Sequence, residues 1–127
     1  MTEKHSTVLV AKCLAGYPCR YHGCAVPPRQ RLLSRLAERH EIALFCPEEA
    51  SGLPTPRPAS RWRDGKLMAD GQDVTPFFQR GAELALNLAR RLGAVKFYGL
   101  RWSPSCDPQT GVTAQALSKH GIKCHFG

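Results

Sequence analysis

The sequence predicts an α/β fold: a single compact domain over residues 1–127 with a mainly parallel sheet, flanking helices in a Rossmann-like arrangement, and a small β-hairpin. Three observations support this prediction. Short apolar runs alternate with amphipathic stretches along the chain, and an Asp-Gly pair lies between two apolar segments. The hydrophobic content of 43% is sufficient for one modest core without disulfide bonds.

The first β-α-β unit occupies the N-terminal third of the chain. Residues 6–13, STVLVAKC, form a valine-rich run that predicts a buried strand, and residues 41–46, EIALFC, repeat that signature. Residues 28–40 place leucines on one face behind a proline, which predicts a helix and hence a right-handed crossover between parallel strands. Residues 47–60 hold four of the ten prolines, so we expect an extended, rigid loop there.

The remaining elements follow in the same alternating order. Residues 61–71 carry the Asp-Gly hairpin signal. Residues 75–93 predict a long helix that begins at a capping threonine and ends at a glycine. Residues 94–102 predict a third buried strand. A short helix over residues 113–120 and a short strand over residues 122–127 complete the domain.

The charge of the chain indicates no dedicated macromolecular partner. The net charge of +8 comes from scattered arginines and lysines, with no block of like charges that would mark a nucleic-acid-binding tail. A solvated basic surface is the favoured interpretation, and weak attraction to anionic substrates or RNA is the alternative. No stretch approaches the roughly 18 apolar residues of a membrane span, and no secretion signal is recognisable, so we expect a cytoplasmic protein. No pattern indicates an oligomeric state.

Six cysteines in a chain of this length favour metal binding, because a reducing compartment argues against three disulfides. Cys13, Cys46 and Cys106 each lie at or just beyond the carboxyl end of a predicted strand. In an open parallel sheet these ends meet at one edge, so we expect the three thiols to converge in a crevice. Three thiolates can hold a soft metal centre and leave one coordination position open, as catalytic sites require.

The other three cysteines have simpler interpretations. Cys19, six residues after Cys13, is the first candidate for a fourth ligand and Cys24 is a weaker one. Both are more readily interpreted as small, partly buried loop residues. Cys124 lies inside the last predicted strand, where a cysteine usually acts as a small core hydrophobe. The residues alone therefore indicate a metal site without naming the metal.

Several separated motifs share one family pattern. Residues 13–21 read CLAGYPCRY, and the later motifs are Cys46-Pro-Glu48, Gly52 to Arg57, Asp73 to Thr75 with Gly81-Ala82, Ser103 to Cys106, and Gly111 to Ala114. In this order, over roughly residues 7–122, they resemble the thiouracil desulfidase family, also known as domain of unknown function 523.

The resemblance implies an oxygen-sensitive 4Fe-4S cluster held by Cys13, Cys46 and Cys106, with the fourth iron free to bind sulfur. It also implies an enzyme that removes sulfur from a small thiolated base, such as 2-thiouracil, without net redox chemistry. In that reaction the cluster serves as Lewis acid and sulfur acceptor while water attacks the ring carbon. Glu48, two residues after a ligand, is the candidate to activate water or carry protons, and Glu49 is the alternative.

Further site residues are predicted beside these cysteines. Ser105 is predicted to act in catalysis and Ser103 in substrate binding, since a hydroxyl or N–H there could bond the substrate ring or a cluster sulfide. Arg20, Tyr21 and Arg57 carry planar groups that can hydrogen-bond to a pyrimidine or stack on it. The alternative for the serines is turn formation, and for the arginines it is an ordinary surface position.

The chain departs from the family pattern after Cys106. Only residues 107–110, DPQT, separate this cysteine from Gly111, where the family usually carries a longer glycine-rich excursion, and Asp107 replaces the usual glycine. His22 replaces the usual aspartate of the opening motif. We therefore expect the cluster to be retained and the choice of substrate to differ. The alternative function is a non-catalytic iron-sulfur or zinc module that binds RNA or a protein partner.

Overall fold

The computed structural model describes residues 6–19, 21–24 and 27–127. Within these residues the chain forms a parallel sheet of four strands and a separate antiparallel sheet of three short strands. The predicted α/β fold with a mainly parallel sheet is confirmed. The parallel strands, in the order β2-β1-β6-β7, are β1 (Ser6–Ala11), β2 (His40–Phe45), β6 (Ala94–Gly99) and β7 (Lys123–Phe126).

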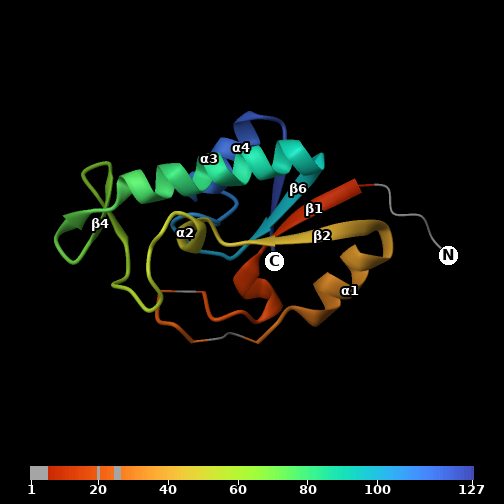
Figure 1. The fold of residues 1–127 in the computed structure, drawn as a ribbon, viewed down its shortest axis with the longest axis horizontal. Helices are drawn as coiled ribbons and strands as arrows, with labels where there is room; N and C mark the ends of the chain where they lie inside the picture. Colours follow the sequence, from red (N-terminus) through yellow and green to blue (C-terminus); the bar gives the residue numbers. More distant parts are fainter. Residues whose placement is uncertain (1–5, 20, 25–26) are drawn as a thin grey trace.

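Helices cover both faces of the parallel sheet (Figure 1). The helix α1 (Gln30–Arg39) connects β1 to β2 on one face, while α3 (Thr75–Leu92) and α4 (Val112–Lys119) pack together on the other. Two short elements follow strand ends: the 3-10 helix η1 (Lys12–Ala15) after β1, and α2 (Pro47–Ala50) after β2. No helix in the described part of the chain is long and apolar enough to cross a membrane.

The order of the strands creates a switch point at the centre of the sheet. The strand β2 adds to one side of β1, whereas β6 and then β7 add to the other side. At such a point the loops that follow the two central strands leave the sheet in opposite directions, and a crevice opens at their carboxyl ends. Cys13 follows β1 and Cys106 follows β6, so the topology brings both cysteines to that crevice.

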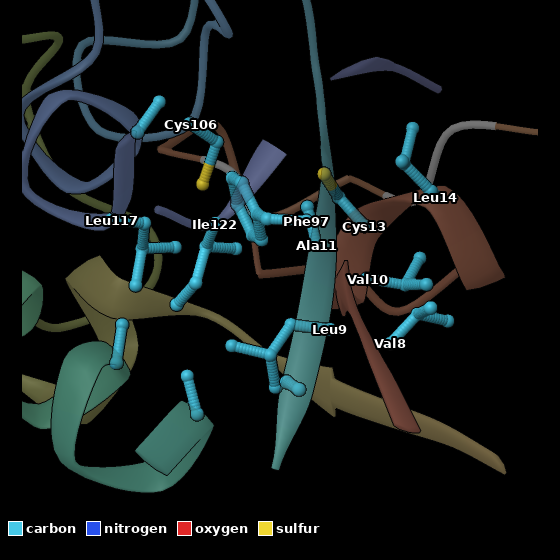
Figure 2. Close-up of a cluster of buried hydrophobic side chains, with 14 of the residues drawn as sticks. Val8, Leu9, Val10, Ala11, Cys13, Leu14, Phe97, Cys106, Leu117 and Ile122 are labelled. Atoms are coloured by element: carbon cyan, nitrogen blue, oxygen red, sulfur yellow. The ribbon is translucent and has the colours of Figure 1, made fainter. Parts of the chain in front are cut away.

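The core that holds these strand ends is apolar and closely packed. Residues 8–10 of β1 and Phe97 of β6 are completely buried. Figure 2 shows Cys13 and Cys106 at the same end of this cluster, beyond Val10 and Ala11 along the chain direction of β1. Full burial of a large apolar side chain typically contributes about 1.5–3 kcal/mol, so the core fixes the strand ends from which the cysteine loops depart.

The predicted hairpin is confirmed, and the structure adds a third strand to it. The strands are β3 (Arg61–Arg63), β4 (Lys66–Ala69) and β5 (Gln72–Asp73), paired in antiparallel order. Both turns consist of an Asp-Gly pair whose residues have positive φ, 51° and 77° at Asp64-Gly65 and 50° and 76° at Asp70-Gly71. The second pair is the signal that could have predicted β5.

Two predicted strands end earlier than expected. The strand predicted over residues 6–13 ends at Ala11, because the chain turns into η1 and carries Cys13 within it. The strand predicted over residues 94–102 ends at Gly99, where the returning loop packs against the backbone. A Cβ atom at Gly99 would lie 1.8 Å from the carbonyl oxygen of Cys106, so this close approach requires glycine.

The segment after β2 is also more ordered than predicted. Residues 47–60 were expected to be extended throughout, but they begin with the helical turn α2, since Pro47 has the φ that suits a first helical position. The sulfur of Cys46 caps this turn by accepting the N–H of Glu49 at 3.5 Å. The helix α3 begins after Val74 rather than at a Thr75 cap, and the Thr75 hydroxyl instead accepts the N–H of Leu67.

Candidate active site

A cavity of about 150 Å³ opens at the carboxyl edge of the sheet, between the ends of β1, β2 and β6. Arg20 lies outside the described residues. All the other predicted site residues line the cavity: Cys13, Tyr21, Cys46, Glu48, Arg57, Ser103, Ser105 and Cys106. The structure therefore brings these residues to one place, and their individual roles stay predictions.

Two of the three strand-end cysteines, Cys46 and Cys106, have raised pKa values that favour protonated thiols in the metal-free chain. Burial raises the pKa of Cys106 far above its ordinary value, although the Ser105 hydroxyl, 3.4 Å from the sulfur, acts in the opposite direction. A hydrogen bond with Cys19 and burial together raise the pKa of Cys46. Cys13 is likewise buried. Because a metal is bound by thiolates, binding here must release these protons.

Cys19, which the sequence analysis named as the first candidate for a fourth ligand but interpreted more readily as a partly buried loop residue, belongs to the cavity. It is only 3% exposed and lines the same cavity. Its thiol interacts with those of Cys13 and Cys46, and the hydrogen bond to Cys13 raises the pKa of Cys19 to about 11. The loop from η1 folds back over the sheet edge and so carries Cys19 to the strand ends. Its spacing from Cys13 was the only signal of this position.

The four cavity cysteines are not arranged around a single point. Among the described residues, no three His, Cys, Asp or Glu side chains converge closely enough to hold one metal ion. A mononuclear zinc site needs every sulfur about 2.3 Å from the same ion. An iron-sulfur cluster offers a different iron to each thiolate, so its ligands need not converge in this way. The all-sulfur donor set fits such a cluster.

Glu48 is held in the cavity by an ion pair with Arg57. The Oε2 atom of Glu48 accepts a hydrogen bond from Nη2 of Arg57, and its Oε1 atom accepts one from the Ser105 hydroxyl at 3.3 Å. Arg57 is 9% exposed, and its guanidinium also donates to the carbonyls of Pro54 and Cys19, both at 3.1 Å. Most of the N–H donors of the Arg57 guanidinium are therefore engaged. Arg57 is placed to anchor Glu48 and to join the loop that carries Cys19 to the one that carries Pro54.

Glu49, the alternative acid or base, points to the rim of the site. Its carboxylate pairs with Lys12 at 2.8 Å, in a partly exposed position. Lys12 lines the cavity, but Glu49 does not. The geometry therefore favours Glu48 for chemistry inside the cavity, while the Lys12–Glu49 pair contributes at most about 1 kcal/mol as a surface ion pair.

The two predicted serines have different positions. The hydroxyl of Ser103 accepts the N–H groups of Ser105 and Cys106 at 3.3 and 3.1 Å, so Ser103 closes the turn that carries Cys106. Ser105 is 2% exposed, and its hydroxyl lies between Oε1 of Glu48 and the sulfur of Cys106. Turn formation thus accounts for much of the bonding of Ser103, whereas Ser105 links the carboxylate to a cysteine.

Asp107 organises the shortened loop after Cys106. Its Oδ1 atom accepts the N–H groups of Gln109 and Thr110 at 2.9 and 3.1 Å, and its Oδ2 atom accepts that of Trp102 at 2.6 Å. Burial alone would raise the pKa of Asp107, but these hydrogen bonds outweigh it and lower the pKa. The Asp107 carboxylate therefore closes the short segment after Cys106 into a compact turn. His22 lies elsewhere, where its ring accepts the N–H of Cys24 at 3.0 Å.

Comparisons with known proteins identify the family of the chain. A 4Fe-4S-dependent thiouracil desulfidase, TudS, has a solved structure similar to this one, with a TM-score of 0.87, 34% sequence identity, and coverage of 95% of this chain and 90% of that chain. The uncharacterized protein YbbK of Bacillus subtilis is 29% identical over 141 aligned positions, which cover 91% of this chain and 92% of that protein. The 2-thiouracil desulfurase family profile matches residues 8–126. The chain belongs to the 2-thiouracil desulfurase family.

Proposed function

We propose that this protein is a 4Fe-4S-dependent desulfidase that hydrolyses the thiocarbonyl group of a thiolated pyrimidine such as 2-thiouracil. One observation carries the proposal: three thiols from separate strand ends and an anchored carboxylate line one cavity. Family membership and the likeness to a thiouracil desulfidase support this chemistry. The overall reaction is balanced by one water, which supplies the oxygen of the product while the sulfur leaves as sulfide.

Cys13, Cys46 and Cys106 would hold the cluster. Their thiol groups are the donor type that iron-sulfur clusters require, and they reach the cavity from three different loops. When bound, the cluster would supply a Lewis-acidic iron site for the substrate sulfur. The N–H of Glu49 points at the sulfur of Cys46 and the Ser105 hydroxyl lies beside that of Cys106, so both thiolates would be stabilised by hydrogen bonds.

Glu48 is proposed as the general base and proton carrier. Arg57 holds the Oε2 atom, which fixes the orientation of the carboxylate and leaves Oε1 toward Ser105 and the cavity. At Oε1 the carboxylate can accept a proton from water as the oxygen adds to the ring carbon. Ser105 can then pass or stabilise this proton, because its hydroxyl contacts both Glu48 and Cys106. No other carboxylate lines the cavity among the described residues.

The substrate is proposed to be a small thiolated base rather than a nucleic acid. The cavity has a volume of only about 150 Å³, and Tyr21 at its lining is 42% exposed, so an aromatic surface is available to a planar ring. Ser103 and the backbone near it offer polar contacts to such a ring. We also propose a cytoplasmic location, because a cluster with an accessible iron is best preserved in a reducing compartment.

The test is anaerobic reconstitution with iron and sulfide, followed by incubation with 2-thiouracil and measurement of both sulfide and uracil. We expect the two products in equal amounts. The Glu48→Gln variant should lose about 100-fold or more in kcat, since general acid–base catalysis typically contributes that much. Its visible cluster spectrum should not change.

Glu49→Gln is the matched control, because it removes the neighbouring carboxylate at the rim and should retain most activity. Failure to release sulfide from any thiolated base, with an intact cluster, would refute the enzymatic function and favour the non-catalytic binding module. Equal losses in the two glutamine variants would instead contradict the role given to Glu48 alone.

A further inference from the structure

Trp102 has an unusual place at the mouth of the cavity. It follows β6 in the turn that leads to Cys106 and belongs to the cavity lining. Its side chain is 85% exposed, more than any other large apolar side chain among the described residues. An indole of this size left in water at a site entrance is available to contact a ligand.

The backbone at Trp102 is strained. Its φ is +66°, in the left-handed region that glycine and asparagine tolerate and that a bulky aromatic residue rarely adopts. The strain is maintained by Asp107, which is 4% exposed and whose carboxylate accepts the N–H of Trp102 at 2.6 Å. Strained residues held by their surroundings concentrate at functional sites. The Arg101 guanidinium lies 5.9 Å from the centroid of the Trp102 ring, but most of the residue is in solvent, so a packing role accounts for little of its surface.

The size of the cavity indicates what the indole could contact. A volume of about 150 Å³ is similar to that of an apolar cavity that holds a single benzene ring in another protein. If the cavity cysteines hold a cluster, it would fill much of this volume, and a substrate ring would then lie farther out, beside the exposed part of the lining that includes Trp102. There the ring would meet the exposed face of Trp102, and stacking on an aromatic side chain is how proteins commonly bind single bases.

We propose that Trp102 is the platform on which the pyrimidine ring of the substrate stacks, and that Asp107 is the residue that positions it. The identity of the ring rests on the proposed desulfidase function; the platform itself rests on exposure, strain and place in the cavity. Asp107 acts through the backbone and has no contact with substrate. The guanidinium of Arg101 lies 5.9 Å from the centroid of the Trp102 ring and 4.3 Å from that of the Phe126 ring, so it lies near both aromatic side chains and leaves most of the indole free.

Direct binding can be measured without turnover, because uracil has the substrate ring but no sulfur to remove. The chain contains two tryptophans, so in the Trp62→Phe variant the emission comes from Trp102 alone. Titration of the reconstituted variant with uracil should quench this emission and reach saturation. The reciprocal variant, Trp102→Phe, reports on Trp62 of the hairpin and should show no change.

Steady-state kinetics distinguish a stacking role of Trp102 from a purely structural one. Trp102→Asn keeps a residue that accepts positive φ but removes the ring, so it should raise KM for 2-thiouracil about 5- to 150-fold, as loss of base stacking does, with kcat within a few-fold. Its Tm should equal or exceed that of the wild type, because the strain is relieved. Trp102→Phe should show a smaller rise in KM, and Trp62→Phe should show none.

The outcomes distinguish this inference from the proposed function. Sulfide release by the wild type with unchanged KM in Trp102→Asn, or with no quenching of Trp102 by uracil, would overturn the platform and leave the desulfidase intact. Saturable quenching without sulfide release would support the platform and refute the reaction. Absence of both signals would refute both, and the exposed indole would then be a surface for another partner.

Discussion

Four of the six cysteines line the cavity, and the other two do not. Cys13, Cys46 and Cys106 follow the carboxyl ends of three strands. Cys124, by contrast, lies within β7 and directs its thiol to the carbonyl of Ala114 at 3.4 Å. Cys24 is exposed on a loop. The difference shows that the place of a cysteine in the fold, not the number of cysteines, determines whether it lines the cavity.

The largest expected effect is loss of the cluster when a strand-end cysteine is removed. Cys106→Ala should abolish iron binding and activity, because no other thiol in the cavity comes from the β6 loop. Cys124→Ala is the matched control and should retain full iron content. Iron and acid-labile sulfide are counted after anaerobic reconstitution. Equal iron in both variants would break the distinction between the two groups of cysteines.

A smaller effect is expected at Cys19, which shares the cavity but not the strand-end position. Cys19→Ser keeps a small polar side chain beside Cys13 and Cys46, so the reconstituted variant should keep its iron. We expect the cluster to decay faster in air, because a close neighbour of two proposed ligands has changed. The decay of visible absorbance measures this effect. Loss of iron as complete as in Cys46→Ala would make Cys19 a ligand.

The smallest effect distinguishes the two cysteines outside the cavity. Burial raises the pKa of Cys124 to about 11, so its thiol stays protonated and unreactive near neutral pH. Iodoacetamide should therefore label the exposed Cys24 first, and labelling of Cys124 should increase as the pH approaches 11. Mass spectrometry of the labelled peptides shows the order. Faster labelling of Cys124 at neutral pH would contradict the burial seen in the structure.

Much of the fold could be predicted because its signals are local. The alternation of apolar runs and amphipathic stretches marks β1, α1, β2, α3 and β6, and each run is contiguous in sequence. The presence of Cys13, Cys46 and Cys106 in one cavity also follows from this order, since parallel strands place their carboxyl ends at one edge.

The parts that could not be predicted depend on contacts between distant segments. Arg57 bonds to the Cys19 carbonyl across 38 positions, and Ser105 reaches Glu48 across 57. These contacts bury Cys19 and convert Arg57 from a surface residue into an anchor. The positive φ of Trp102 likewise depends on a hydrogen bond to the side chain of Asp107. Residue preferences for helix, strand or turn do not predict such a bond.

The most direct test of the central claim is the Mössbauer spectrum of the anaerobically reconstituted protein prepared with iron-57. Three cysteine ligands predict a 4Fe-4S cluster in which one iron differs from the other three and changes its parameters when 2-thiouracil is added. A cluster with four equivalent irons that ignores 2-thiouracil, or a spectrum of isolated iron without a cluster, would contradict the account.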